Sequence, residues 1–525
     1  MNRVEFTCNG VAVAVEAEPG ESLLNVLRER LGITSAKDGC APQGQCGCCT
    51  VLVDGEPRVA CVTPVTRVVG RTVTTVEGLP SDLRDAFAAA FVAAGGSQCG
   101  FCTPGIVMRF AGGRVRNVDR SLAAHLCRCT GWLTVREAIA GAHNPPRDWE
   151  RASARATLEG GTQHVGLDVP LGGAAFADDT APRDALVAVP RPTGSAVAAV
   201  EAAGVDWVVG ESLLEARALA GKVQGRRTTV DARPPLLDRM PQCPPGGVQL
   251  ATQWVEPAYL EPDASWCTPG GEPATPLANG GAFGGKLDSC APRAARALAD
   301  QFGRTVRVVY AREDVVRLGP KRPPIAAVAA AHGDRVEIEG VIVRGGEPRV
   351  WPCEGVEVRA RWTGVDVAGP PVSGAVRAAG LAEQALLVSG ALGRDMPVVS
   401  PSGARASASV TLTDGKVTGI AVQVAAGEPL DEIVLHSYAV GAAHMALGWI
   451  TSEGLAVDPV TGDVHDLTIR SFGILRASEM PTVDVEIVAD DAPARARSTD
   501  AVFAAVAAAT WNALGRPVTL PAHAR

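Results

Sequence analysis

The chain has 525 residues, which is enough for three or four domains with substantial cores. Its net charge of −8 and its pI of about 5.6 exclude the basic surface expected of a nucleic-acid-binding protein. No apolar run reaches the roughly eighteen residues of a membrane span, and the first residues lack the pattern of a secretory leader. We therefore expect a soluble, cytoplasmic protein.

The first eighty residues predict a small β-sheet with one helix. Residues 4–8 and 11–15 are β-rich runs joined by an Asn-Gly turn, which favours a tight hairpin. Ser22 can cap a helix whose leucines recur at helical spacing. A second hairpin and a strand at 72–76 follow before the Gly-Leu-Pro sequence that ends at Pro80.

Most of the fourteen cysteines lie between Cys40 and Cys129, and eight of them divide into two groups of four. Thiolates in fours bind soft metal centres, either zinc or an iron–sulfur cluster. The first group lies in a glycine-rich loop and the hairpin after it, whereas the second lies in a C-x2-C and a C-x-C motif. The two groups are Cys40, Cys46, Cys49 and Cys61, and Cys99, Cys102, Cys127 and Cys129.

The spacing of the first group favours an iron–sulfur cluster. Plant-type [2Fe–2S] ferredoxins space their ligands C-x4-C-x2-C with a fourth further on, and the spacing here is C-x5-C-x2-C. A turn at Asp54-Gly55 predicts a hairpin that folds Cys61 back towards the loop. Glycines in the loop suit backbone wrapped closely round a cluster whose sulfurs accept N–H hydrogen bonds. Zinc is the alternative, and a disulfide framework is a weaker one because no secretory leader precedes it.

The second group alone leaves zinc and iron–sulfur both open. Its surroundings at 98–105 and 126–132 resemble the second-cluster motifs of the xanthine dehydrogenase, aldehyde oxidase and CO dehydrogenase family, the molybdenum hydroxylases. Residues 37–51 are similar to that family's first-cluster motif, with one extra residue between the first two ligands. The resemblance covers residues 1–143 and implies that the eight cysteines hold two [2Fe–2S] clusters.

The resemblance also implies an α+β fold built from successive domains. Within the second of these, Pro104-Gly105 predicts a helix that begins just after Cys102, so its N-terminus would face the thiolates. Prolines and charged residues predict a linker after that domain. The expected order is a β-grasp [2Fe–2S] ferredoxin domain at 1–80, a helical [2Fe–2S]-binding bundle at 81–143, a linker at 144–161, a shortened first domain of the molybdenum subunit type at 162–245, and a shortened mixed α/β molybdopterin-binding-like domain at 246–525.

One glycine-rich motif stands out in the second half, at residues 280–286. On its own it favours a structural turn, because it is neither a P-loop nor a dinucleotide fingerprint. It looks like the family's G-G-x-F-G-G-K loop, which lies against the molybdenum centre, and residues 376–380 are similar to an arginine-bearing cofactor loop. The cofactor-binding residues that the resemblance implies are Gln98 beside the pterin, Phe283, Gly284, Gly285, Lys286 and Arg377.

The second half also departs from the family. It is much shorter than a molybdopterin-binding subunit, and no glutamine- and glycine-rich cofactor loop lies between Arg377 and Val410. The family's catalytic glutamate should precede an Ala-rich helix at 501–509, yet residues 494–500 contain no glutamate, so the catalytic residue is unknown. Glu383 and Glu479 are conceivable replacements, although a surface or helix carboxylate is the favoured interpretation for both.

The family hydroxylates a C–H bond with oxygen from water, and electrons leave molybdenum singly through two [2Fe–2S] clusters to FAD. No flavin domain follows residue 143, so FAD is expected on a partner chain, and a full-length molybdenum subunit is a further candidate partner. We therefore expect an iron–sulfur electron-transfer component whose cofactor half is degenerate. The alternatives are an active molybdopterin-dependent hydroxylase of a heterocyclic or aldehyde substrate with a non-standard base, and a zinc-stapled interaction module with no redox role.

Overall fold

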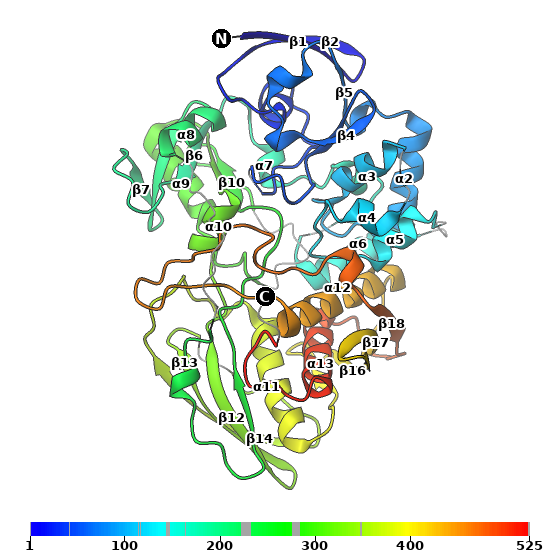
Figure 1. The fold of residues 1–525 in the computed structure, drawn as a ribbon, viewed down its shortest axis with the longest axis vertical. Coiled ribbons are helices and arrows are strands. Elements are labelled where there is room, and N and C mark those ends of the chain that lie inside the picture. Colours follow the sequence, from blue (N-terminus) through cyan, green and yellow to red (C-terminus); the bar gives the residue numbers. More distant parts are fainter. Residues whose placement is uncertain are drawn as a thin grey trace.

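The structure is a computed structural model that describes residues 2–40, 42–113, 115, 117–142, 147–162, 164–221, 233–275, 284–346 and 349–522. The chain begins at one end of the molecule and its C-terminal half forms the other (Figure 1). One continuous hydrophobic core runs from the N-terminal sheet through the first helices into the C-terminal half. A smaller sheet beside the N-terminal domain has a core cluster of its own.

The N-terminal domain is a five-stranded sheet with one helix, in the order β2-β1-β5-β3-β4. β1 pairs parallel with β5, and the other neighbours pair antiparallel. Both predicted hairpin turns are present, because Asn9 and Asp54 adopt positive φ beside their glycines. This confirms the β-grasp arrangement. The elements are β1 Asn2–Cys8, β2 Val11–Ala17, α1 Leu23–Asn25 with a π-helical continuation at Val26–Arg30, β3 Thr50–Val53, β4 Glu56–Val59 and β5 Thr72–Thr74.

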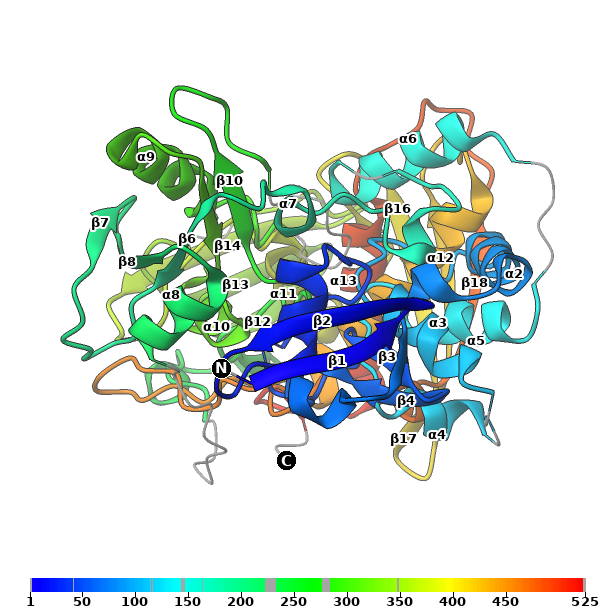
Figure 2. The ribbon, with the colours of Figure 1, turned by 90° about the horizontal axis from the view of Figure 1, so that it is seen from above.

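The predicted helical domain follows directly. Its helices are α2 Ser81–Ala93, α3 Thr103–Ala111, α4 Val118–Leu122 and α5 Leu133–Ile139. As predicted, α3 begins immediately after Cys102, with Pro104 in its first turn. Seen from above, the β1–β2 hairpin lies between these helices on one side and the sheet of β6 and β8 on the other (Figure 2).

The described part of the expected linker, residues 147–161 of 144–161, contains helix α6, Trp149–Gly160. Asp148 caps it by accepting the backbone N–H groups of Glu150 and Arg151. Its buried face packs on α12, Glu432–Thr451, and includes Arg155 and Glu159 as well as two alanines. The helix was not evident from the sequence because this charged pair interrupts the apolar stripe that identifies an amphipathic helix.

The boundary expected between the domains at 162–245 and 246–525 does not separate two sheets. One five-stranded sheet, ordered β10-β11-β6-β8-β7, joins strands from both sides of it, and β6 pairs parallel with β11. The strands are β6 Leu186–Pro190, β7 Val200–Ala202, β8 Val205–Gly210, β10 Ala264–Cys267 and β11 Val306–Val309, and the accompanying helices are α7 Ala177–Thr180, α8 Leu213–Ala220, α9 Ala291–Phe302 and α10 Arg312–Leu318.

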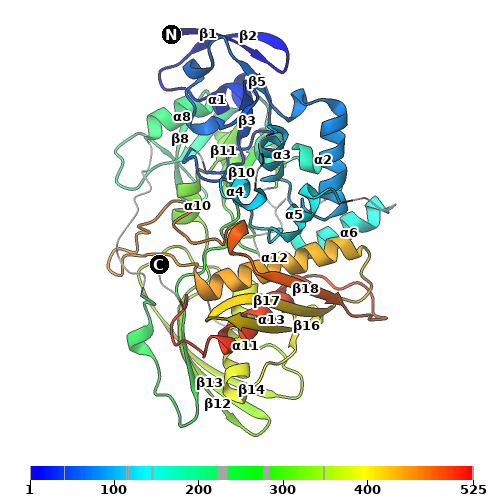
Figure 3. The same ribbon diagram turned by 45° about the vertical axis from the view of Figure 1, so that its right-hand side comes forward.

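The rest of the chain forms two four-stranded sheets with helices between them (Figure 3). α11 packs on β9 and β12 of one sheet, whereas α13 packs on β16 and β17 of the other. The strands are β9 Val248–Ala251, β12 Ile325–His332, β13 Arg335–Val343, β14 Glu357–Val365, β15 Val398–Val399, β16 Arg405–Thr413, β17 Lys416–Ala425 and β18 Thr482–Ile487, and the helices are α11 Arg377–Leu392 and α13 Ser498–Ala513.

Helix α12 is the one helix of the described residues whose length and composition would let it cross a membrane. Its most apolar window has a mean hydropathy of 1.3, yet 89% of that window is buried inside the protein. The helix packs against α13, α6 and β18. These contacts account for its apolar character as that of a core helix.

Candidate functional site

The four cysteines of the first group lie together in the ferredoxin domain, and all are buried. The β3–β4 hairpin returns Cys61 to Cys49, and the Cys61 backbone N–H donates to the Cys49 sulfur at 3.4 Å. At the other end of the loop the Gln45 N–H donates to the Cys40 sulfur at 3.5 Å. The Cys40 thiol contacts those of Cys46 and Cys61, and Cys61 also contacts Cys49. The sulfurs thus form a row in which backbone N–H groups hold those of Cys40 and Cys49, and the Cys46 thiol also contacts that of Cys48.

The second group lies at the ends of α3 and α5 and forms two pairs. The sulfurs of Cys99 and Cys129 are 3.6 Å apart, and the thiols of Cys102 and Cys127 contact each other. The hydrogen bond from Cys102 lowers the pKa of Cys127 to about 6, and the Thr130 hydroxyl, 3.0 Å from the Cys127 sulfur, contributes to the same shift. The same hydrogen bond raises the pKa of Cys102, so Cys127 is the thiol of this pair that is more readily deprotonated, as a metal ligand must be.

The paired sulfurs of the second group fit a two-iron cluster better than a zinc ion. A [2Fe–2S] cluster takes its four thiolates as two pairs, one for each iron, whereas a structural zinc gathers four ligands round one point. Among the residues that the structure describes, no group of three or more His, Cys, Asp or Glu side chains is arranged to hold a single metal ion. In the first group the loop backbone lies close to the sulfurs, because a methyl group on Gly39 would be 3.2 Å from the Cys46 sulfur.

The two cysteine groups lie back to back, because their loops touch through the backbone. The Leu126 N–H donates to the Cys46 carbonyl oxygen at 2.9 Å. Glycines permit this approach: a methyl group on Gly105 would lie 2.3 Å from the Gly47 carbonyl oxygen. His125 is buried beside Gly47, neither of its ring nitrogens has a hydrogen-bond partner among the described residues, and burial lowers its pKa to about 3. Tightly packed protein backbone and side chains therefore fill the space between the two cysteine groups.

Gln98, expected beside the pterin, and Lys286, expected in the loop against the molybdenum centre, make contacts within the protein. The Gln98 side-chain amide donates to the Cys129 carbonyl oxygen at 2.9 Å and to the Ser437 hydroxyl of α12 at 2.9 Å. The Lys286 ammonium group forms a buried ion pair with Glu261 and lies 3.8 Å from Asp263.

These two contacts lie in different parts of the fold, at α12 and at the segment before β10. Burial raises the pKa of Glu261 to about 7, although Lys286 opposes the shift. Gly284 adopts a φ of +86° next to Gly285, as a tight turn requires. Phe283 and the Arg377 side chain lie outside the described residues, so the proposed cofactor contacts stay predictions.

The two candidate replacement bases have ordinary structural surroundings. Glu383 is buried in α11 and pairs with Arg322 at 2.6 Å, and burial raises its pKa. Glu479 is exposed and accepts the Arg476 backbone N–H in a short 3₁₀ turn. These surroundings agree with the favoured interpretation of both as helix or surface carboxylates.

A carboxylate does stand at the start of α13, but it comes from α6. The two oxygens of Glu159 accept hydrogen bonds from the backbone N–H and hydroxyl groups of Ser498 and Thr499. Arg155, one turn earlier in α6, forms a buried ion pair with it. Sequence reasoning missed Glu159 because it lay in the expected linker, although the Arg155–Glu159 spacing is that of a helical ion pair.

Buried ion pairs fix the ferredoxin domain to the segment around α7. Arg28 contacts Asp178 at 2.7 Å and Asp179 at 2.9 Å, and Lys37 also pairs with Asp179. Burial opposes ionisation of Asp178, but Arg307 and Arg28 lower its pKa to about 2. The domains on either side of these pairs are therefore held at a fixed separation.

A comparable pair fixes the second cysteine group to the C-terminal half. Arg128, between Cys127 and Cys129, forms a buried, two-pronged ion pair with Glu453, and its Nη2 lies 2.9 Å from Oε2 of Glu453. Its Nε also donates to the Pro257 carbonyl oxygen at 2.9 Å. The cysteine loop and the C-terminal half are thus parts of one packed unit.

Comparison with known proteins agrees with this arrangement. Residues 75–140 match the [2Fe-2S] binding domain family. The nicotinate dehydrogenase small FeS subunit of Eubacterium barkeri is 34% identical over 149 residues, which cover 26% of this chain and 94% of that protein. The xanthine dehydrogenase iron-sulfur-binding subunit of Escherichia coli O157:H7 is 37% identical over 146 residues, which cover 25% of this chain and 88% of that protein.

A solved structure resembles the whole chain. The aldehyde oxidoreductase of Desulfovibrio gigas superposes with a TM-score of 0.74, covering 100% of this chain and 99% of that one. Its identity of 14% makes this a likeness of fold alone. Because this chain covers nearly all of two iron–sulfur subunits at more than 30% identity, it belongs to the xanthine dehydrogenase, aldehyde oxidase and CO dehydrogenase family of oxidoreductases, the molybdenum hydroxylases.

Proposed function

We propose that this chain is the iron–sulfur component of a molybdenum hydroxylase-type complex and carries electrons one at a time through two [2Fe–2S] clusters. The observation that carries the proposal is the arrangement of eight buried thiols as a row and two pairs on adjoining loops. Cys48 and Cys8 are left as structural thiols. The assigned ligands are Cys40, Cys46, Cys49 and Cys61 for the first cluster and Cys99, Cys102, Cys127 and Cys129 for the second.

Electrons enter this chain at the second cluster and leave it from the first. The second group is covered by α12 and the C-terminal half, whereas the first lies beside a cavity described below. Relatives named as a small FeS subunit and an iron-sulfur-binding subunit favour a complex of several chains. We infer that FAD lies on a partner chain and that a full-length molybdenum subunit supplies the electrons, in the cytoplasm, where thiols stay reduced.

One observation favours the alternative of an active molybdopterin-dependent hydroxylase, namely the likeness of fold to an aldehyde oxidoreductase along the whole chain. The described residues do not fit the cofactor as the family's pattern would require. The Gln98 amide and the Lys286 ammonium group already bind protein acceptors, and residues 494–500, at the start of α13, contain no glutamate. We therefore assign the second half as a scaffold and assign no reaction step to molybdopterin.

Alanine at Cys127 tests the ligand assignment, because alanine cannot bind iron in its place. The reduced Cys127→Ala protein is expected to lose one of two cluster signals in electron paramagnetic resonance, and its iron should fall from about four to about two per chain. Cys48→Ala is the matched control, since Cys48 is equally buried in the first cysteine loop, and it should keep both signals. Two surviving signals in Cys127→Ala would show that the second group is wrongly assigned.

A further inference from the structure

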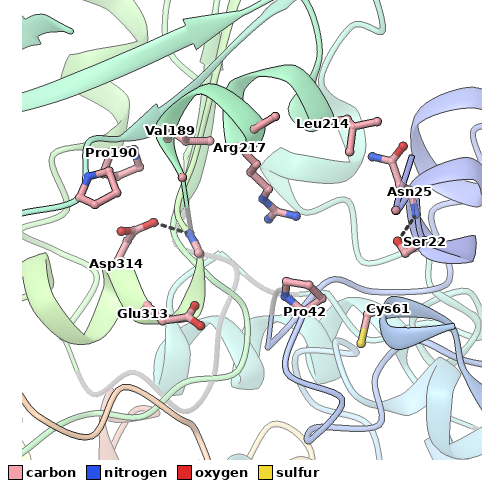
Figure 4. A pocket seen from close by; sticks show the side chains of 16 residues that line it. Ser22, Asn25, Pro42, Cys61, Val189, Pro190, Leu214, Arg217, Glu313 and Asp314 are labelled. Atoms are coloured by element: carbon pink, nitrogen blue, oxygen red, sulfur yellow. Dashed lines mark hydrogen bonds between the residues drawn. The ribbon is translucent and has the colours of Figure 1, made fainter. Parts of the chain in front are cut away.

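A cavity of about 290 Å³ lies beside the first cysteine group, between the ferredoxin domain and the sheet that contains β6. Cys61, which is only 4% exposed, lines it. Figure 4 shows Arg217 of α8 on one side of the space and Cys61 with Pro42 on the other. A molecule in this cavity would therefore lie against an assigned ligand of the first cluster.

The walls of the cavity suit a flat, neutral aromatic ring. They are mostly apolar and are formed by rigid or short side chains, among them Pro42, Val189, Pro190, Pro192, Leu214 and Ala218. Flat rings bury much area against such walls at little cost in conformational entropy. The planar Arg217 guanidinium adds hydrogen-bond donors and a surface for stacking, and one of its nitrogens already donates to Asp38 at 3.0 Å.

Two carboxylates on the wall disfavour an anionic ligand. Glu313 accepts a hydrogen bond from the Gln43 side chain at 2.9 Å, and Asp314 accepts the Ala311 backbone N–H at 2.9 Å while pairing with Arg317. Both face the same space as Arg217. Asp314 is paired with Arg317, and Arg217, the basic residue of the described lining, is already paired with Asp38. A phosphate-bearing nucleotide would have to compete with Asp38 for Arg217, whereas a neutral ring with carbonyl groups would not.

The cavity is already formed, because its walls are fixed to each other. One wall belongs to the ferredoxin domain and the other to α8, α10 and β6. The ion pairs of Arg28 and Lys37 with Asp179, described above, and that of Arg217 with Asp38 connect the two sides. Binding therefore requires no rearrangement of the domains, which favours affinity for a small ligand.

We propose that this cavity binds a neutral, flat aromatic electron acceptor, the size of a naphthoquinone or a flavin ring system, and that electrons leave the chain there. The inference rests on the proposed function as an electron carrier. Two clusters, each reduced by one electron, return to the oxidised state, while the ring takes up those two electrons and two protons from water to become its dihydro form. The ring comes either from a free quinone or from a flavin carried by the partner chain.

Filling the cavity tests the proposal. Leu214→Trp places a large side chain in the space, and Leu219→Trp is the matched control because Leu219 lies on the same helix, is 50% exposed and does not line the cavity. Binding of menadione by equilibrium dialysis and of lumiflavin by fluorescence is measured with the oxidised, cluster-containing protein. Leu214→Trp is expected to weaken the binding of the accepted ring about tenfold or more, with no change in Leu219→Trp.

The rate of cluster reoxidation gives a second readout. After reduction with dithionite, reoxidation by the accepted ring should slow by a similar factor in Leu214→Trp, whereas reoxidation by ferricyanide, which needs no cavity, should not change. An effect on menadione assigns a free quinone, and an effect on lumiflavin alone assigns a flavin ring from the partner.

The cavity assignment would be overturned if the parent, Leu214→Trp and Leu219→Trp proteins bound each ring with the same affinity, or if the parent bound neither ring. Iron content and both cluster signals are measured on the same samples. If the clusters were missing, the proposed function itself would fail, whereas intact clusters with unaltered binding would reject only the role of the cavity.

Discussion

Gly441→Ala is expected to destabilise the protein and to remove the signal of the second cluster. A methyl group on Gly441, in the middle of α12, would lie 1.7 Å from the Cys129 carbonyl oxygen. The methyl group would be fixed to the helix backbone and the oxygen belongs to the backbone of the cysteine loop. No side-chain rotation can relieve this clash, so α12 and the loop would have to move apart. Alanine normally stabilises a helix by about 0.5–1 kcal/mol relative to glycine, but overpacking of this kind costs about 1–3 kcal/mol or more.

The same substitution at an open position provides the control. At Gly374, no atom of the residues that the structure describes lies within 4 Å of the position that a methyl group would occupy. Gly374→Ala should therefore keep the parent's denaturation midpoint and both cluster signals, measured by chemical unfolding and by electron paramagnetic resonance of the reduced protein. A Gly441→Ala protein with parental stability and two intact signals would refute the close packing of α12 on the second cysteine group.

Glu159→Gln is expected to cost about 3–5 kcal/mol of unfolding free energy, the range for breaking a buried ion pair. The carboxylate of Glu159 balances the charge of Arg155 and accepts four hydrogen bonds from the first residues of α13. Glutamine has the same shape but no charge, so Arg155 would remain buried without its counter-ion.

Glu150→Gln is the matched control, because Glu150 is an exposed residue of the same helix. Its effect should stay within about 0.5 kcal/mol, as for most surface substitutions. Urea unfolding followed by circular dichroism measures both variants. Identical midpoints for the two would mean that Glu159 does not support the junction of α6 and α13.

The features that the sequence predicted well depend on local chemistry. Asn9-Gly10 and Asp54-Gly55 form turns because these residues tolerate positive φ, and the two hairpins follow from them. The start of α3 beside Cys102 follows from the proline in its first turn. In both cases the information lies within a few residues of the structure that it determines.

The features that were missed depend on contacts between distant parts of the chain. β6 pairs with β11 more than a hundred residues later, and no change in composition marks that partnership. α6 looked like a linker because its buried face contains Arg155 and Glu159, which only tertiary pairing makes compatible with burial. Likewise, the pairing of Lys286 with Glu261 could not be read from the glycine-rich motif.

Metal content, measured by mass spectrometry on protein purified without added metals, decides whether the two cysteine groups hold iron–sulfur clusters. Two [2Fe–2S] clusters predict about four irons and about four acid-labile sulfides per chain. We expect these values, with neither zinc nor molybdenum in stoichiometric amount. About one molybdenum per chain together with the iron would instead favour the active hydroxylase. Zinc in place of iron would contradict the proposed electron-transfer function.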